Sequence, residues 1–159
     1  MRSYRSQEKQ VEEVQKIEPT FTEWHDLQVN DLNRFAMHTT YFAYEDIQKA
    51  LKGDMYKSDN FLSLHGDWKF NWVENADQRP TDFYLTDLND ASWKTMPIPG
   101  MWELNGFGDP EYVNSGFAWR GHFDQKPPAV PVKDNHVGSY RRVITLPEAW
   151  EGKQVIAHF

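Results

Sequence analysis

The sequence contains no cysteine, and this absence excludes several kinds of chemistry. A chain without thiols forms no disulfide, builds no thiolate metal site and has no cysteine nucleophile. The N-terminal decapeptide M-R-S-Y-R-S-Q-E-K-Q is basic, but no apolar segment follows it, so the sequence as written shows no secretion signal. The localisation is therefore unknown, and cytoplasm and periplasm are both compatible with the chain.

Long apolar runs and basic clusters are missing as well. A membrane-spanning helix needs about 20 consecutive apolar residues, and no run of that length occurs. The formal net charge of -7 disfavours a polyanionic partner. No basic patch is interleaved with aromatic residues, as nucleic-acid-binding surfaces usually are. We therefore expect neither a membrane nor a nucleic acid as partner.

Helical periodicity is confined to short segments near the N-terminus. Residues 7–18 place Val, Val and Ile at helical spacing, and Pro19 follows them. We predict that residues 1–22 form a tail that contains this short helix. Residues 23–56 indicate an extended arm and linker, because Asn and Asp interrupt their apolar residues. Within this arm, Gln48–Tyr56 is expected to form a linker or a helical turn.

Aromatic residues, in contrast, are plentiful: they make up 15% of the chain, with seven Trp, seven Tyr and ten Phe. Because each large ring buries much surface, they can form a core although only 39% of the residues are hydrophobic. The clearest strand signal is Phe61–Val73, where a tight turn is expected at Gly66-Asp67 and rings then alternate with polar residues. This alternation predicts that Trp68, Phe70 and Trp72 form a sandwich core. The alternative is that the three rings form a platform on which a sugar stacks.

Further strands are predicted at Val137–Leu146 and at residues 154–159. One helical turn is predicted at Thr81–Tyr84, and Trp93 is expected to anchor the core. Short strands joined by Pro- and Gly-rich loops indicate an all-β sandwich over residues 57–159. Because the sequence ends inside the last predicted strand, we expect this sandwich to be incomplete at its C-terminus.

The stretch Met96–Asn114 combines turn-forming residues with large apolar ones. Its prolines and glycines argue against a helix interior and a central strand. Its Met, Trp, Leu, Phe and Tyr side chains distinguish it from a flexible linker. We predict an ordered loop that is pinned by aromatics and leads to an extended segment at Tyr112–Asn114. Rigid loops often carry binding groups; a purely structural loop is the alternative.

The same stretch, P-I-P-G-M-W-E-L-N-G-F-G-D-P-E-Y-V-N, resembles the signature of the N-terminal domain of β-galactosidases of glycoside hydrolase family 2. The flanking stretches L-H-G-D-W-K-F-N-W, N-D-A-S-W-K-T-M-P-I-P and P-P-A-V-P-V-K-D-N-H-V-G-S-Y-R-R occur in the family's order. The resemblance covers roughly Glu23 to Phe159. It implies a galactose-binding-like jelly roll within a hydrolase that releases terminal non-reducing β-D-galactose with retention.

The resemblance also implies a substrate contact at Asn114, whose family counterpart hydrogen-bonds the galactosyl unit. An amide suits this task because it can both donate to and accept from a sugar hydroxyl. The alternative, favoured by the residues alone, is an Asx-turn before Ser115-Gly116. We assign Asn114 as the single candidate substrate-binding residue.

No catalytic residue is assigned. A retaining glycosidase needs two carboxyl groups about 5 Å apart, but most of the 24 Asp and Glu residues lie in charged runs. An Asn-Glu-Pro element of the kind that carries the family's acid/base is absent. The resemblance places both catalytic glutamates in a downstream barrel, so we expect the chain alone to be inactive.

Metal ligation is only weakly indicated. Glu23, Asp26 and the carbonyl of Val29 match part of a structural Mg²⁺ site of some family members, and hard oxygen ligands suit this ion. The remaining ligands would follow Phe159, so we expect no metal or other cofactor in this stretch. By resemblance, Mg²⁺ and Na⁺ belong to the complete enzyme.

The partners that the resemblance implies are a β-galactoside or galactose-containing oligosaccharide and the remainder of a β-galactosidase chain, which forms a homo-oligomer. Two alternatives stay open at this point. One is a stand-alone carbohydrate-binding module that stacks sugars on Trp68, Trp72 or Trp102. The other is an interaction fragment whose arm complements an enzyme that lacks it.

Overall fold

The computed structural model describes residues 20–30, 32, 34–110, 119 and 129–159. The chain divides into two compact units, residues 1–39 and 40–159. The helix predicted for residues 7–18 lies outside the described residues. In the first unit the described part has one short 3₁₀ turn, η1 (Glu23–His25), and is otherwise irregular, as expected for an arm. Among the described residues, no helix has the length and apolar character needed to cross a membrane.

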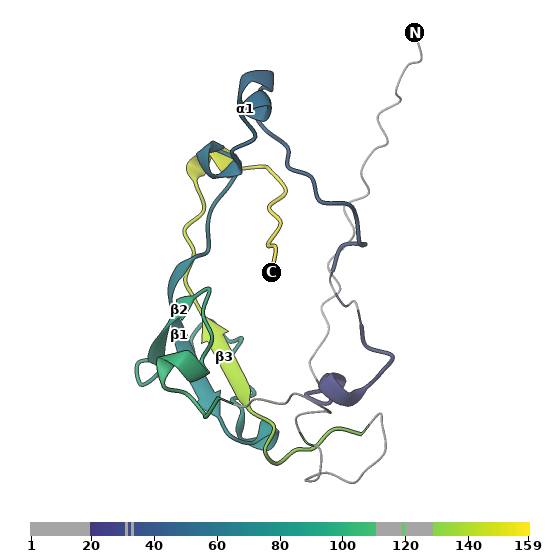
Figure 1. Ribbon diagram of the computed structural model, residues 1–159, viewed down its shortest axis with the longest axis vertical. Helices are drawn as coiled ribbons and strands as arrows, with labels where there is room; N and C mark the ends of the chain where they lie inside the picture. The colour runs from purple at the N-terminus through teal and green to yellow at the C-terminus, as the bar shows by residue number, and fades with distance from the viewer. Residues whose placement is uncertain (1–19, 31, 33, 111–118, 120–128) are drawn as a thin grey trace. The chain divides into compact units, whose positions relative to one another are not determined.

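The second unit contains a three-stranded antiparallel sheet (Figure 1). Strand β1 (Gly66–Val73) lies between β2 (Lys94–Ile98) and β3 (Val137–Arg141). The described helices are short: α1 (Ile47–Lys52) and the 3₁₀ turns η2 (Met55–Lys57), η3 (Ala76–Gln78), η4 (Glu103–Asn105) and η5 (Glu148–Trp150). This β-rich architecture agrees with the all-β fold class expected from the sequence.

The core lies on the inward face of β1, as the alternation of its rings predicted. Phe70 has no exposed surface, and the same is true of Met96 on β2. Trp68 and Trp72, on the same face of β1, are partly buried. The ring of Phe70 packs 4.6 Å from that of Tyr140, its partner in the β1–β3 register. Burial of a Phe side chain stabilises a fold by about 1.5–3 kcal/mol.

Several predicted element boundaries are wrong. Gly66-Asp67 forms no turn but begins β1. Gly66 pairs with Ile98 of β2, and its own backbone φ is 117°. Thr81–Tyr84 forms turns without a helix. β2 contains Pro97, which a strand accepts here because β2 is an edge of the described sheet and needs no donor on that side.

The strand predicted for Val137–Leu146 stops at Arg141, and residues 154–159 form no strand. Val143 is 94% exposed and Phe159 is 93% exposed. A strand needs a neighbour with which to share hydrogen bonds, and in the described part of the chain no strand pairs with these residues. Alternation in the sequence shows that a segment fits a sheet, but it does not supply the partner strand.

Two adjacent arginines at the end of β3 fasten loops to the sheet. Arg141 donates through Nε to Asp90 Oδ2 at 3.0 Å and through Nη1 to the carbonyl of Leu85 at 2.7 Å. Its guanidinium carbon lies 6.0 Å from the ring centroid of the partly buried Trp93. Arg142 donates to the carbonyls of Leu64 and His65.

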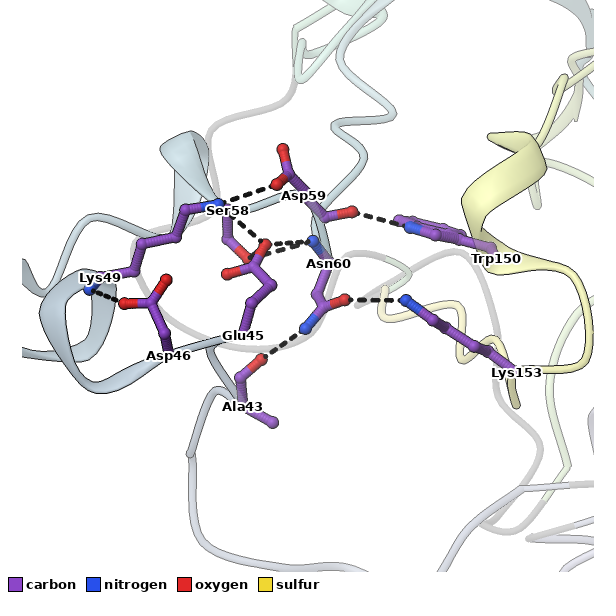
Figure 2. Close-up of polar contacts among 9 residues, drawn as sticks. All are labelled: Ala43, Glu45, Asp46, Lys49, Ser58, Asp59, Asn60, Trp150 and Lys153. Carbon is purple, nitrogen blue, oxygen red and sulfur yellow. Dashed lines mark hydrogen bonds and ion pairs between the residues drawn. The ribbon is translucent and has the colours of Figure 1, made fainter.

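A polar cluster joins the segment around α1 to η5 (Figure 2). Glu45 accepts hydrogen bonds from Ser58 Oγ at 2.9 Å and from the amide of Asn60 at 3.1 Å. The Nζ atom of Lys49, in α1, lies 3.4 Å from Oε1 of Glu45 and 2.8 Å from Oδ2 of Asp59. The Asp59 carbonyl accepts from the indole of Trp150 at 2.7 Å. Lys153 Nζ donates to Asn60 Oδ1 at 3.4 Å, and we call all these residues the Glu45 cluster.

The protonation of Glu45 contributes to the pH range over which this cluster holds. Partial desolvation acts to raise the pKa of Glu45, but hydrogen bonds from the main chain and from Ser58, together with Lys49, outweigh it and lower the pKa from 4.5 to about 2. A carboxylate with a depressed pKa stabilises the folded state fully above its unfolded pKa and loses this effect as the pH falls through the folded pKa.

We therefore predict that the attachment of η5 persists at pH 4 and is lost as the pH falls toward 2. The ¹H–¹⁵N signal of the Trp150 indole reports it directly, because this group donates to Asp59. Glu45→Gln should remove the pH dependence of this signal, whereas Glu74→Gln, at an exposed position after β1, should preserve it. A wild-type signal that already shifts between pH 5 and pH 4 would contradict the prediction.

Candidate functional site

The candidate site begins where β2 ends, with residues 99–110, which we call the motif loop. Two of its rings pack on the buried Phe70. The ring centroid of Phe107 lies 4.7 Å from that of Phe70 in an edge-to-face arrangement, and that of Trp102 lies at 6.2 Å. The prediction of an ordered loop pinned by aromatics is thus confirmed for its described part.

Hydrogen bonds fix the path of the motif loop around η4. The amides of Asn105 and Phe107 both donate to the carbonyl of Trp102, at 2.9 and 3.1 Å. The Asn105 side chain donates back to the carbonyl of Met101 at 2.8 Å. Gly106 then adopts a φ of 85°, a left-handed conformation that other residues resist. Together these contacts hold the reversal of the chain at this point.

Gly138 on β3 allows the loop to approach the sheet. A Cβ at this position would lie 2.6 Å from Cε2 of Phe70 and 2.7 Å from Cζ3 of Trp102. The indole of Trp102 therefore packs across the backbone of Gly138. The alternation that predicted a strand over Val137–Leu146 assigned no role to Gly138, although a glycine inside a strand is a known sign of close backbone approach.

The other side of the loop rests on Trp72. Gly108 has a φ of 68°, and a Cβ there would lie 3.1 Å from Cζ2 of the Trp72 ring. The imidazole of His136 also packs on Trp72, with 5.0 Å between the ring centroids. Among the residues that the structure describes, the buried indole N–H groups of Trp72 and Trp102 have no acceptor. Both rings therefore hold the motif loop through packing contacts.

A hollow of about 190 Å³ opens beside the motif loop. Its wall combines two carboxylates and an imidazole with apolar side chains: Met101, Glu103, Leu104, Asp109, Pro110 and His136. Burial raises the pKa of the nearby Tyr140 phenol, and the negative charge of Glu103 raises it further. Carboxylates can accept hydrogen bonds from hydroxyl groups, and apolar side chains can cover the C–H faces of a sugar.

Asn114, the predicted substrate contact, lies outside the described residues, as does the extended segment expected at 112–114. The structure places the hollow beside the aromatic rings that fix its wall. The described part of the motif loop ends at Pro110, before Asn114.

The carboxylates proposed for Mg²⁺ serve local main-chain contacts. The Glu23 carboxylate accepts from the amide of Thr20 at 2.6 Å, and this hydrogen bond lowers the pKa of Glu23. Asp26 Oδ1 accepts from the amide of Gln28 at 2.9 Å. In the described ranges, no group of three His, Asp or Glu residues gathers as a metal site would require. Glu23 and Asp26 therefore supply hard oxygen atoms, but the described residues do not complete a metal-binding set around them.

An antiparallel β unit that carries a ring-pinned loop beside a hollow of mixed polar and apolar character is consistent with a sugar-binding β domain. Comparison with known proteins makes this specific. Residues 61–159 match the sugar binding domain of the glycosyl hydrolases of family 2, and the chain belongs to this family.

Relatives carry the names of enzymes. The chain is 32% identical over 140 residues to a β-galactosidase of Priestia megaterium, covering 87% of this chain and 14% of the relative. It is 36% identical over 134 residues to a β-galactosidase of Lactobacillus delbrueckii subsp. bulgaricus, covering 84% and 13%. A β-galactosidase large subunit of Leuconostoc lactis is 29% identical over 146 residues, covering 84% and 23%. The chain thus spans only a small part of the length of these relatives.

The contact at Gly138 generates a prediction about the loop. Gly138→Ala should lower the free energy of unfolding by about 1–3 kcal/mol, because the added methyl overpacks two rings that cannot move independently. The Phe107 amide, which the motif loop protects, should exchange faster. Urea unfolding and hydrogen exchange measure the two effects.

Gly53→Ala is the matched control. Gly53 has a φ of 66°, and no atom lies within 4 Å of the place that a Cβ would take, so the substitution strains the end of α1 without touching the loop. It should leave exchange at Phe107 unchanged. Equal exchange at Phe107 in wild type and Gly138→Ala would show that the loop does not depend on this contact.

Proposed function

We propose that this chain is the N-terminal sugar-binding region of a β-galactosidase that hydrolyses terminal non-reducing β-D-galactose residues by a retaining mechanism. The observation that carries the proposal is the match of residues 61–159 to the family's sugar binding domain, in relatives that are named β-galactosidases. The hollow beside the motif loop supports it, because its side chains suit hydroxyl groups and C–H faces. The substrate class is a β-galactoside or a galactose-containing oligosaccharide.

In this proposal the sheet β2-β1-β3 is part of a jelly-roll sandwich. Segments that alternate like strands but share no ladder with the described sheet support it, since they present exposed apolar side chains that further strands could cover. These side chains are Val143, Ile144, Leu146, Val155, Ile156 and Phe159.

Asn114 would contact the galactosyl unit from this domain. It follows Pro110, in the wall of the hollow, by four positions, and an extended chain of that length reaches at most about 14 Å. The rigid path of the motif loop up to Pro110 limits where the amide can lie. An amide placed in this way brackets a hydroxyl as both donor and acceptor.

The two carboxyl groups of the retaining reaction, about 5 Å apart, belong in this proposal to a downstream barrel. One donates a proton to the leaving oxygen and the other forms the glycosyl-enzyme bond, which water then hydrolyses. Mg²⁺ and Na⁺ belong to the complete enzyme, where Glu23, Asp26 and the Val29 carbonyl would supply part of an Mg²⁺ site. The complete enzyme is a homo-oligomer.

The first test concerns the chain by itself. The 159-residue chain should not hydrolyse a nitrophenyl β-galactoside above the no-enzyme rate, because the proposal assigns the catalytic pair to a downstream barrel. A fusion in which this chain replaces the matching segment of the Priestia megaterium relative should hydrolyse it. Turnover by the chain alone that survives purification and scales with its concentration would refute the assignment of the chemistry to a downstream region.

The second test concerns Asn114 in that fusion. Asn114→Ala should lower kcat/KM for the galactoside by the equivalent of about 1–3 kcal/mol, because a sugar hydroxyl loses its partner in the transition state. The melting temperature should change little. Asn89→Ala, which alters an exposed asparagine before Trp93, should leave kcat/KM unchanged. Unchanged kinetics in Asn114→Ala, or a collapse of its melting temperature, would favour the turn-residue alternative.

A further inference from the structure

The hollow beside the motif loop has negative charge in its wall. Glu103 and Asp109 line it together with His136, and the other lining side chains are apolar. Oδ1 of Asp134 lies 3.5 Å from Nε2 of His136, so a proton on this imidazole would face a carboxylate that already neutralises it. The imidazole therefore adds no net positive charge to its surroundings, and the wall as a whole is acidic.

A fixed backbone carries both carboxylates of the wall. Glu103 begins η4, which the main-chain hydrogen bonds of the motif loop hold in place. Asp109 follows Gly108, which packs on the ring of Trp72. The two charged residues are thus anchored before a ligand arrives, and binding does not have to order the chain that carries them.

Neither carboxylate of the wall is neutralised by a cation in the part of the chain that the structure describes. The ion pairs of these ranges all involve other residues. The charge of Glu103 also acts on its neighbours: burial raises the pKa of the Tyr140 phenol, and the negative charge of Glu103 raises it further. A group that enters the hollow therefore experiences the field of these carboxylates.

We propose that the hollow selects its ligand by charge: it binds a sugar that carries an ammonium group in preference to a neutral sugar, and it rejects a sugar that carries a carboxylate. Glu103 and Asp109 are the specificity-determining residues, and the inference rests on the proposed function. The chemistry of the donors supports it. An ammonium group donates three hydrogen bonds to carboxylates and a hydroxyl group donates one, whereas a carboxylate can only accept and is repelled by both residues.

The size of the hollow agrees with a single sugar unit. Its volume of about 190 Å³ is smaller than the roughly 300–1,000 Å³ of sites that enclose drug-sized ligands. Met101, Leu104 and Pro110 supply the apolar part of the wall, which can cover the C–H groups of a sugar ring. The apolar side chains then contribute contact area for any sugar, and the carboxylates discriminate between sugars of different charge.

Three methyl β-galactosides that differ only at C6 test the inference on the 159-residue chain. They carry a hydroxymethyl, an aminomethyl or a carboxyl group, and at about pH 7.5 the last two are charged. The amide signals of Met101 and Leu104 in the ¹H–¹⁵N spectrum report binding at the hollow. We expect the dissociation constant of the amino sugar to be roughly tenfold lower than that of the uronide, with the neutral galactoside between them. The difference should shrink when the salt concentration rises from about 0.01 M to about 1 M, because salt screens the charges.

Glu103→Gln and, separately, Asp109→Asn should each narrow this difference, because the amide keeps the size of the side chain but has no charge. Glu151→Gln is the matched control: it removes one negative charge from an exposed position that does not line the hollow, and it should leave the order of affinities unchanged.

Three results would overturn the inference: a uronide that binds as tightly as the amino sugar, a difference that neither wall variant narrows, or no response of the Met101 and Leu104 amides to any of the three glycosides. Hydrolysis of a nitrophenyl β-galactoside by the fusion with the Priestia megaterium relative tests the proposed function separately. A fusion that hydrolyses this substrate while the chain fails to discriminate by charge would contradict only the role of Glu103 and Asp109.

Discussion

The packing of rings around Phe70 is the interaction on which the described β unit depends. Phe70 lies in the central strand and is fully buried, so one side chain touches both a neighbouring strand and the loop above the sheet. Tyr140 contacts it from β3, and Trp102 and Phe107 contact it from the motif loop. A loop rich in proline and glycine would otherwise have few apolar contacts to hold it. The same rings that form the core therefore also fix the wall of the hollow.

Polar contacts have a different role in this molecule. Arg141, Arg142 and the Glu45 cluster connect segments that bury few apolar atoms, and many of these pairs are partly exposed to solvent. Exposed ion pairs contribute little stability individually. A guanidinium that donates to several carbonyls nevertheless dictates where a passing chain can lie, because its donors form a rigid fork. These contacts determine the course of the connecting segments, while burial of apolar surface is the dominant favourable term in folding.

The parts that could be predicted from the sequence are those with local causes. The alternation of rings along β1 and the aromatic content of the motif loop both follow from residues that are neighbours in the chain, and the structure confirms both. The end of β3 and the missing strand at 154–159 depend on whether a partner strand exists, which no local pattern contains. Gly66 shows the same limit, since a Gly-Asp pair suits a turn until the pairing with Ile98 makes it a strand. The predicted role of Asn114 is a further case, because the residues around it favour an Asx-turn and only the family resemblance indicates a sugar contact.

The rigidity of the motif loop fits the proposed function, in which this domain positions a sugar for chemistry performed elsewhere in the enzyme. A sugar contact contributes most when its position is fixed before the ligand arrives, because ordering a loop during binding costs free energy that the contact must offset. The motif loop meets this condition through Phe70, Gly138 and Trp72, none of which belongs to the loop itself. In the proposed function, a wall that is fixed in this way would keep a bound sugar at a constant distance from catalytic groups that lie elsewhere in the enzyme.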